Sequence, residues 1–229
     1  MMEAFALAGL GALAWGTYNP RSRFFGRIIR HGDASRPVIY LTFDDGPNPV
    51  ATPSILETLT CAGVPATFFM VGRHIERFPA IARATADAGH AVGNHTWSHV
   101  KLHTRGPRRI AAELARCHAA LTDVAGVQPR FFRAPHGYRN PFVQPCADRL
   151  GYRTVAWNVG VWDTSRPGVG IIRARVRRAL APGRILLLHD GDGYDPSGDR
   201  RQTAQALAGI IRDTRDAGYD FRPLTELVA

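Results

Sequence analysis

The stretch Pro37–Pro47, PVIYLTFDDGP, decides how the rest of the sequence can fold. Its first seven residues are apolar or β-branched almost throughout, which is typical of a strand buried on both faces. The adjacent carboxylates Asp44 and Asp45 end this strand, and Gly46-Pro47 then turns the chain. Neighbouring like charges cost free energy unless a cation or a proton separates their roles. Taken alone, the stretch predicts either an acidic turn or a cation site at a strand end.

Strand and helix patterns alternate from this strand to the C-terminus. Further strands are predicted at 66–71, 90–92, 130–133, 152–157, 184–189 and 221–227. Helices are predicted at 79–89, 107–126, 142–150, 170–181 and 202–217, and one more from Thr52, as N-cap before Pro53, to Gly63. No linker divides them, so we expect an α/β fold, a single-domain irregular (β/α) barrel of about seven mostly parallel strands. Barrel enzymes keep their active site at the C-terminal strand ends, where the polar clusters of this sequence fall.

The composition is that of a basic globular protein. The 229 residues suit one domain, 45% are hydrophobic, and the net charge is +10. Lys101 is the one lysine, so nearly all of the positive charge is on arginine. This charge indicates either a solvated basic surface or attraction to an anionic partner such as cell wall, phospholipid or acidic glycan. The arginines are scattered and no nucleic-acid motif accompanies them, so we expect no nucleic acid as a partner.

Three cysteines, Cys61, Cys117 and Cys146, indicate neither a disulfide framework nor a zinc knuckle, because their number is odd and no pair has C-x-x-C spacing. Cys61 and Cys117 fall at helical positions and are expected to be small buried apolar residues.

Residues 1–30 are an apolar N-terminal segment followed by an Arg-rich connector. Ala4–Tyr18 carries no charge but is shorter than the roughly 20 residues of a bilayer span. Glu3, the one charge before it, does not supply the basic region of a signal peptide. A membrane-proximal anchor and a plain packing helix both fit this pattern. The positive-inside tendency of the following arginines would leave the rest of the chain in the cytoplasm, yet a membrane-associated or cell-envelope location is favoured over a free cytoplasmic one. These arginines are Arg21, Arg23, Arg27 and Arg30.

Two histidines four residues apart, His95 and His99, form the second polar cluster. They would share one face if the stretch were a helical turn, and imidazole is a common zinc ligand. The spacing alone is a weak signal, because the chain has nine histidines. Combined with the strand-end aspartates it supplies a His₂-carboxylate set. Three protein ligands leave a position open for water, which is typical of a catalytic site.

Two more clusters follow predicted strands. The segment Arg133–Tyr138, RAPHGY, combines an arginine with a Pro-x-Gly turn that could clamp a carboxylate and offer a backbone N–H to a substrate oxygen. By itself this segment is more typical of a loop with a surface arginine. His189 comes directly after the apolar run Leu186–Leu188 and is well placed for acid–base work, since its ordinary pKa is about 6.5. The alternative is a hydrogen-bonded core histidine.

Together these clusters resemble the polysaccharide deacetylase family, the fourth carbohydrate esterase family. The segments TFDDGP (42–47), ATFF (66–69), NHTWSH (94–99), FRAPHG (132–137) and LLLHD (186–190) occur in the family's order and spacing. The resemblance runs from about Pro37 to the C-terminus and makes residues 31–229 the expected catalytic domain.

The resemblance implies a role for each matching residue. Asp45, His95 and His99 would bind the metal, and Asp44 would be the catalytic base. His189 would be the general acid that protonates the departing sugar amine. The resemblance also implies that Arg133 orients the base, that Asp163 tunes His189, and that Leu187 lines the acetyl pocket. Its substrate-binding set adds Pro135, Gly137 and the backbone N–H of Tyr138, with Trp162 on the sugar surface.

The sequence departs from the family at two places. Family members carry an Asp-Trp pair, whereas Thr164 follows Asp163 here, so Trp162 either supplies the missing aromatic wall or belongs to the core. His136 stands where an aromatic residue is usual, and its role is open.

The expected function is metal-dependent hydrolysis of the N-acetyl groups of amino sugars in a chitin-like or peptidoglycan polymer, at carbon–nitrogen bonds other than peptide bonds. The expected cofactor is one divalent ion, zinc first, with cobalt, nickel or manganese as alternatives. The alternative functions are a deformylase or deacylase of a lipid-linked amino sugar and a non-catalytic glycan-binding homologue. A phosphoesterase would need a second metal and more carboxylates. The sugar polymer and the oligomeric state stay open.

Overall fold

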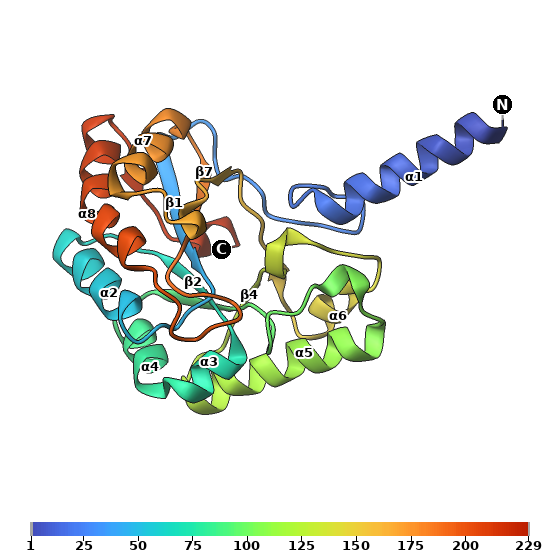
Figure 1. The fold of residues 1–229 in the computed structure, drawn as a ribbon, viewed down its shortest axis with the longest axis horizontal. Helices are drawn as coiled ribbons and strands as arrows, with labels where there is room; N and C mark the ends of the chain where they lie inside the picture. Colours follow the sequence, from blue (N-terminus) through green and yellow to red (C-terminus); the bar gives the residue numbers. More distant parts are fainter. Residues whose placement is uncertain (1, 229) are drawn as a thin grey trace.

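The structure, a computed structural model, describes residues 2–228, with side chains described from residue 9 on. Within these residues, eight strands form one sheet in which every pairing is parallel, as predicted. The order is β5-β4-β3-β2-β1-β7-β6, and β8 also pairs with β1. The sheet curls with helices packed outside it (Figure 1), and no described pairing joins β5 to β6. The strands are β1 Val38–Asp44, β2 Thr67–Met70, β3 Ala91–Asn94, β4 Phe131–Phe132, β5 Arg153–Thr154, β6 Val159–Gly160, β7 Arg184–His189 and β8 Asp220–Phe221.

The helices are α1 Met2–Tyr18, α2 Ala51–Ala62, α3 Gly72–Arg77, α4 Pro79–Asp87, α5 Pro107–Ala119, α6 Val143–Arg149, α7 Val169–Ala179 and α8 Arg201–Asp216. Most of the helices lie between successive strands; α3 and α4 both lie between β2 and β3, and within the described residues no α-helix separates β5 from β6. The sequence did not indicate α3, because its six residues are too few to show a helical period.

Strand β1 lies at the centre of the sheet, and all seven of its residues are buried. On one edge, residues 39–44 pair with β7. On the other edge, β8 pairs with the first two residues and β2 with the last three. Successive side chains point to opposite faces, so Ile39 and Leu41 join the core beneath α2 and α8, whereas Val38 and Tyr40 join a second cluster with Ile185. Burial on both faces explains the uninterrupted apolar run.

Helix α2 begins at Ala51, and its N-cap position is Val50, which makes no side-chain cap, so the predicted N-cap at Thr52 is wrong. The side-chain oxygen of Asn48 accepts hydrogen bonds from the backbone N–H groups of Val50 and Ala51, at 3.0 and 2.9 Å. Thr52 is buried, and its hydroxyl donates to Asp190 Oδ2 at 2.6 Å while it accepts from the Asn48 N–H at 2.8 Å. The stop at Gly63 is confirmed, with the left-handed φ of 62° that favours glycine there.

Two other predictions are corrected. The strand at 221–227 is shortened to β8, because Pro223 has no N–H to donate and the chain then forms a 3₁₀ turn, Leu224–Leu227. Cys61 is exposed on α2 and not buried, whereas Cys117 is buried as predicted. Cys146 is also buried, and all three thiols are free.

Helix α1 projects from the body of the protein (Figure 1). Its side chains at residues 9–15 are exposed, so this part does not pack on the described core. None of the described helices has both the length and the apolar character needed to cross a bilayer.

We predict that Thr52→Val destabilises the protein by about 1–3 kcal/mol. The substitution keeps the volume but leaves the buried Asp190 carboxylate and the Asn48 N–H without their partner. Thr58→Val on the same helix is the matched control, because the Thr58 hydroxyl only donates to Ser54 O at an exposed position. Urea unfolding of the two variants measures the difference. Equal unfolding free energies would contradict the buried role of Thr52.

Candidate active site

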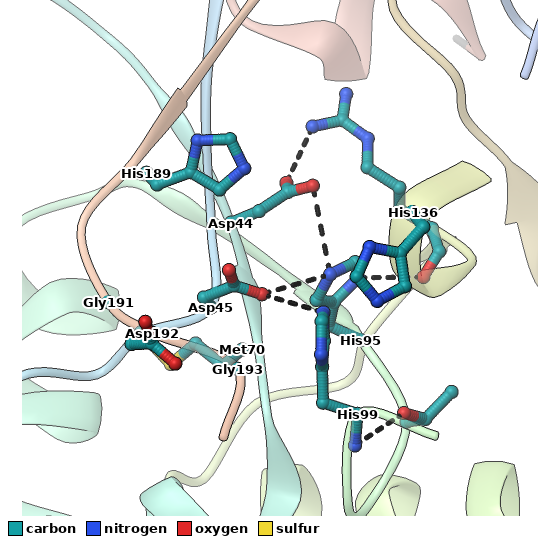
Figure 2. Close-up of polar contacts among 12 residues, drawn as sticks. Asp44, Asp45, Met70, His95, His99, His136, His189, Gly191, Asp192 and Gly193 are labelled. Carbon is teal, nitrogen blue, oxygen red and sulfur yellow. Dashed lines mark hydrogen bonds and ion pairs between the residues drawn. The ribbon is translucent and has the colours of Figure 1, made fainter. Parts of the chain in front are cut away.

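The adjacent residues Asp44 and Asp45 have different backbone conformations at the end of β1. Asp44 is the last residue of the strand, and Asp45 turns the chain with a φ of 78°. This left-handed conformation is uncommon outside glycine and is tolerated best by aspartate and asparagine. The Asp45 N–H still donates to Phe69 O at 3.1 Å, so the turn stays attached to β2. Both carboxylates point toward His95 (Figure 2), and both are buried.

His95 and His99 meet Asp45 from the loop that follows β3. The stretch is not a helical turn, because Thr96 and His99 take φ values of 68° and 57°. The two Nε2 atoms instead face one oxygen, Asp45 Oδ1, at 3.3 Å from His95 and 3.0 Å from His99. One ligand atom from each of the three residues lies within 4.8 Å of the others, and all three are buried. The predicted ligand set is therefore brought together, by a loop instead of a helix.

The chemistry of this group fits a divalent cation. Asp45 Oδ1 is buried and has no hydrogen-bond partner, an unfavourable state for a carboxylate oxygen unless a cation neutralises it. His95 Nδ1 lies 2.8 Å from the carbonyl oxygen of Arg133. Because a carbonyl only accepts, Nδ1 carries a proton, and in the neutral ring Nε2 is then the nitrogen with a lone pair to offer a cation. This second contact is the usual way to orient a metal-binding imidazole.

Asp44 is held by a fully buried arginine. Arg133 Nη1 lies 2.6 Å from Asp44 Oδ1 and also donates to Thr42 Oγ1, while Nη2 donates to Ala156 O. The guanidinium carbon sits 4.1 Å from the centre of the Phe69 ring. The other carboxylate oxygen, Oδ2, is 3.7 Å from His95 Nε2. Asp44 therefore borders the candidate metal position with one oxygen free of the arginine.

His189 faces the site from the end of β7. Its Nδ1 lies 2.9 Å from Asp163 Oδ1, and its backbone N–H donates to Asp163 Oδ2 at 2.8 Å. Thr203 donates to the same Oδ2 at 2.9 Å. Burial alone would lower the pKa of His189, but the negative charge of Asp163 and its hydrogen bond outweigh burial, and Asp45 and Asp44 add to them, so the pKa rises to about 9. His189 is therefore an imidazolium at neutral pH.

These groups share a cavity of about 530 Å³. The predicted substrate residues Tyr138, Leu187 and Trp162 line it, and Trp162 is 76% exposed at its rim. Pro135 and Gly137 are buried behind the lining. The Tyr138 N–H donates to Pro135 O at 3.1 Å in this structure.

The cavity also holds residues that the sequence did not indicate as site residues. Tyr18 and Pro20 reach it from the N-terminal segment, and Trp157 lies beside them. Tyr18 and Pro20 lie far along the chain from every motif, so no local signal marks them, whereas Trp157 lies shortly before Asp163. Tyr194 does follow the LLLHD motif closely, and its hydroxyl lies 3.0 Å from His136 Nε2. The tyrosine ring packs edge-on against His99, so the pair covers one side of the candidate metal group.

A glycine allows this packing. At Gly193 a Cβ would overlap the His99 ring, so no other residue fits between the loop and the histidine. Arg73 Nη2 donates to Gly193 O at 2.7 Å and to Tyr194 O at 2.8 Å, which holds the loop in place.

Comparisons of the sequence and of the structure with known proteins point to the same family. The family model described as polysaccharide deacetylase matches residues 31–155. A chitooligosaccharide deacetylase of Bradyrhizobium sp. (strain ANU 289) is 37% identical over 207 residues, which are 86% of this chain and 94% of that protein. The structure of a peptidoglycan N-acetylglucosamine deacetylase matches with a TM-score of 0.81 and 29% identity, over 87% of this chain and 91% of that one. A CE4 family pseudoenzyme from Bacillus anthracis also has a TM-score of 0.81, with 28% identity over 89% of this chain and 69% of that one.

We predict that the chain binds one divalent ion and that His99→Ala loses it. The substitution removes one of three protein ligands, whereas His136→Ala, the control, removes a neighbouring imidazole outside the group. Titration calorimetry with Zn²⁺ on the metal-stripped proteins measures both. Undiminished binding by His99→Ala, or equal loss in the control, would contradict the assignment.

Proposed function

The chain belongs to the polysaccharide deacetylase family, and we propose that it is a metal-dependent hydrolase that removes N-acetyl groups from glucosamine units of a chitin-like or peptidoglycan oligosaccharide. The observation that carries this proposal is the shared cavity, in which a candidate metal group lies between a carboxylate, Asp44, and an imidazolium, His189. Amide hydrolysis needs a base for the water and an acid for the amine, and this arrangement supplies one on each side.

Asp45, His95 and His99 would hold the ion. One carboxylate and two neutral imidazoles are a zinc-like set of three ligands with an open position, so zinc is our first proposal for the metal. When bound, a divalent ion there supplies Lewis-acid polarisation and lowers the pKa of water.

Asp44 would accept the proton of the attacking water. Arg133 occupies Oδ1, so the proton goes to Oδ2, the oxygen that faces His95. The contact with Arg133 also stops the carboxylate from rotating away, because the guanidinium is anchored by Thr42 and Ala156. Arg133 is a positioning residue in this proposal.

His189 would donate a proton to the leaving amine from Nε2. Asp163 occupies Nδ1 and keeps the ring charged and oriented. An amine leaves far more readily as a neutral group than as an anion, so the imidazolium matters most for amide substrates.

The substrate would contact three residues that line the cavity, Leu187, Trp162 and Tyr138. Leu187 offers an apolar wall for the acetyl methyl group, and the exposed Trp162 ring at the rim offers a face for a sugar ring. The backbone N–H of Tyr138 would turn from Pro135 O to the developing oxyanion, with Pro135 and Gly137 shaping that turn.

We expect acetate release from chitooligosaccharides or peptidoglycan fragments, abolished by a chelator. Asp44→Asn should lower kcat by about 10²–10⁴-fold because the amide cannot accept the proton. Calorimetry should still show a bound ion, since Asp44 is outside the three-residue ligand group. Full activity of Asp44→Asn would disprove the base assignment, and acetate release that resists chelation would disprove the metal dependence.

We also expect the alkaline limb of the pH–rate profile to follow His189. The acid works only while protonated, so activity is present below its pKa of about 9 and falls as the pH rises through that value. Asp163→Asn removes the main contribution that raises this pKa, so the limb should move toward neutral pH. Thr203→Val is the control, because it removes a hydrogen bond to Asp163 but no charge. If the alkaline limb of the pH–rate profile stays in place in Asp163→Asn, His189 paired with Asp163 is not the general acid.

A further inference from the structure

The part of helix α1 whose side chains are described is exposed at residues 9–15 and has no partner there among the described residues. Residues 4–20 contain no charged side chain. Leu10 and Trp15 are 64% and 63% exposed, and Leu13 is 46% exposed. The helix extends away from the sheet and its covering helices (Figure 1). An uncharged helix with exposed apolar side chains needs an apolar environment, and a sequence with no charged residue on any face suits hydrocarbon better than a protein groove, which would bury one stripe.

Cationic side chains follow this helix directly. Arg21, Arg23, Arg27 and Arg30 are all exposed, and none of the ion pairs found among the described residues includes them. A cavity of about 500 Å³ lies where the helix ends. Three of these arginines line it together with Arg184, His31 and Trp15. The arrangement places guanidinium groups, which bind phosphate well, beside an exposed apolar helix.

The segment is attached to the body of the protein by backbone contacts. The Arg139 N–H donates to Thr17 O at 3.1 Å, and the buried Arg139 guanidinium donates to Ser22 O. Further along, the Ile29 N–H donates to Thr154 O at 2.9 Å, and the Ala156 N–H donates to Ile29 O at 2.7 Å. Docking of this segment would therefore orient the whole domain.

We propose that residues 9–30, the docking segment, bind the surface of an anionic phospholipid bilayer. The apolar side chains of α1 enter the acyl region, and the four arginines contact lipid phosphates. Tyr18 and Pro20, at the end of α1, line the active-site cavity. The bound orientation therefore sets the mouth of that cavity close to the membrane surface.

Vesicle co-sedimentation of the full chain tests the proposal. We expect binding to vesicles that contain phosphatidylglycerol, weakened by salt, and little binding to pure phosphatidylcholine. Replacing the four arginines of the docking segment by glutamine should weaken binding about tenfold or more. The matched control replaces four exposed arginines elsewhere, Arg83, Arg108, Arg177 and Arg178, and should bind nearly as the parent does.

Insertion of α1 has a separate readout. Lipids with brominated acyl chains should quench part of the tryptophan emission, and Trp15→Phe should remove that part. Leu10→Gln with Leu13→Gln should weaken vesicle binding while the urea midpoint stays unchanged, because both side chains are exposed. Equal loss of binding in the control arginine set would overturn the proposal. Absence of quenching would overturn it too, and so would self-association through α1, seen by sedimentation velocity, without vesicle binding. None of these measurements depends on catalysis.

Discussion

The parallel register around β1 is the constraint on which the rest of the molecule depends. Asp44 pairs with His189 on one edge and with Phe69 on the other. Met70 pairs with Asn94, and Asn94 pairs with Phe132. Five strands thus end at one level, and the residues at or just after these ends include Asp44, Asp45, His95, Arg133 and His189. A slip of one residue would turn these side chains to the opposite face of the sheet.

Most of the charged side chains at the carboxyl ends of these strands are buried, which strengthens their interactions and also makes each unpaired charge unfavourable. Charges removed from water are tolerated only when they are paired or hydrogen-bonded. Arg133 and Asp44 satisfy each other, and Asp163 and His189 do the same with help from Thr203. Asp45 differs, because only two histidine nitrogens face its buried Oδ1. That asymmetry separates two adjacent aspartates in role, one suited to a proton and the other to a cation.

The docking segment has residues both in the active-site cavity and on the exposed surface of the protein. Its end contributes Tyr18 and Pro20 to the cavity, while residues 9–15 and the four arginines are exposed. The family match begins at residue 31, so these contributions lie before the matched region.

Local patterns in the sequence determined the parallel fold, the residues of the candidate metal group and the order of the strands and helices except for the short elements α3 and β6. These features depend on periodicity, on strand ends and on motif spacing. The predicted boundary of α2 was wrong because a tertiary contact overrode a local preference: the Thr52 side chain turns inward to the buried Asp190 and does not cap the helix, which begins at Ala51. The local conformation around His99 and the reach of Tyr18 into the cavity were decided only by the tertiary structure. They rest on contacts between segments far apart in the chain, such as Gly193 against His99 and Thr17 against Arg139, and no local pattern records such contacts.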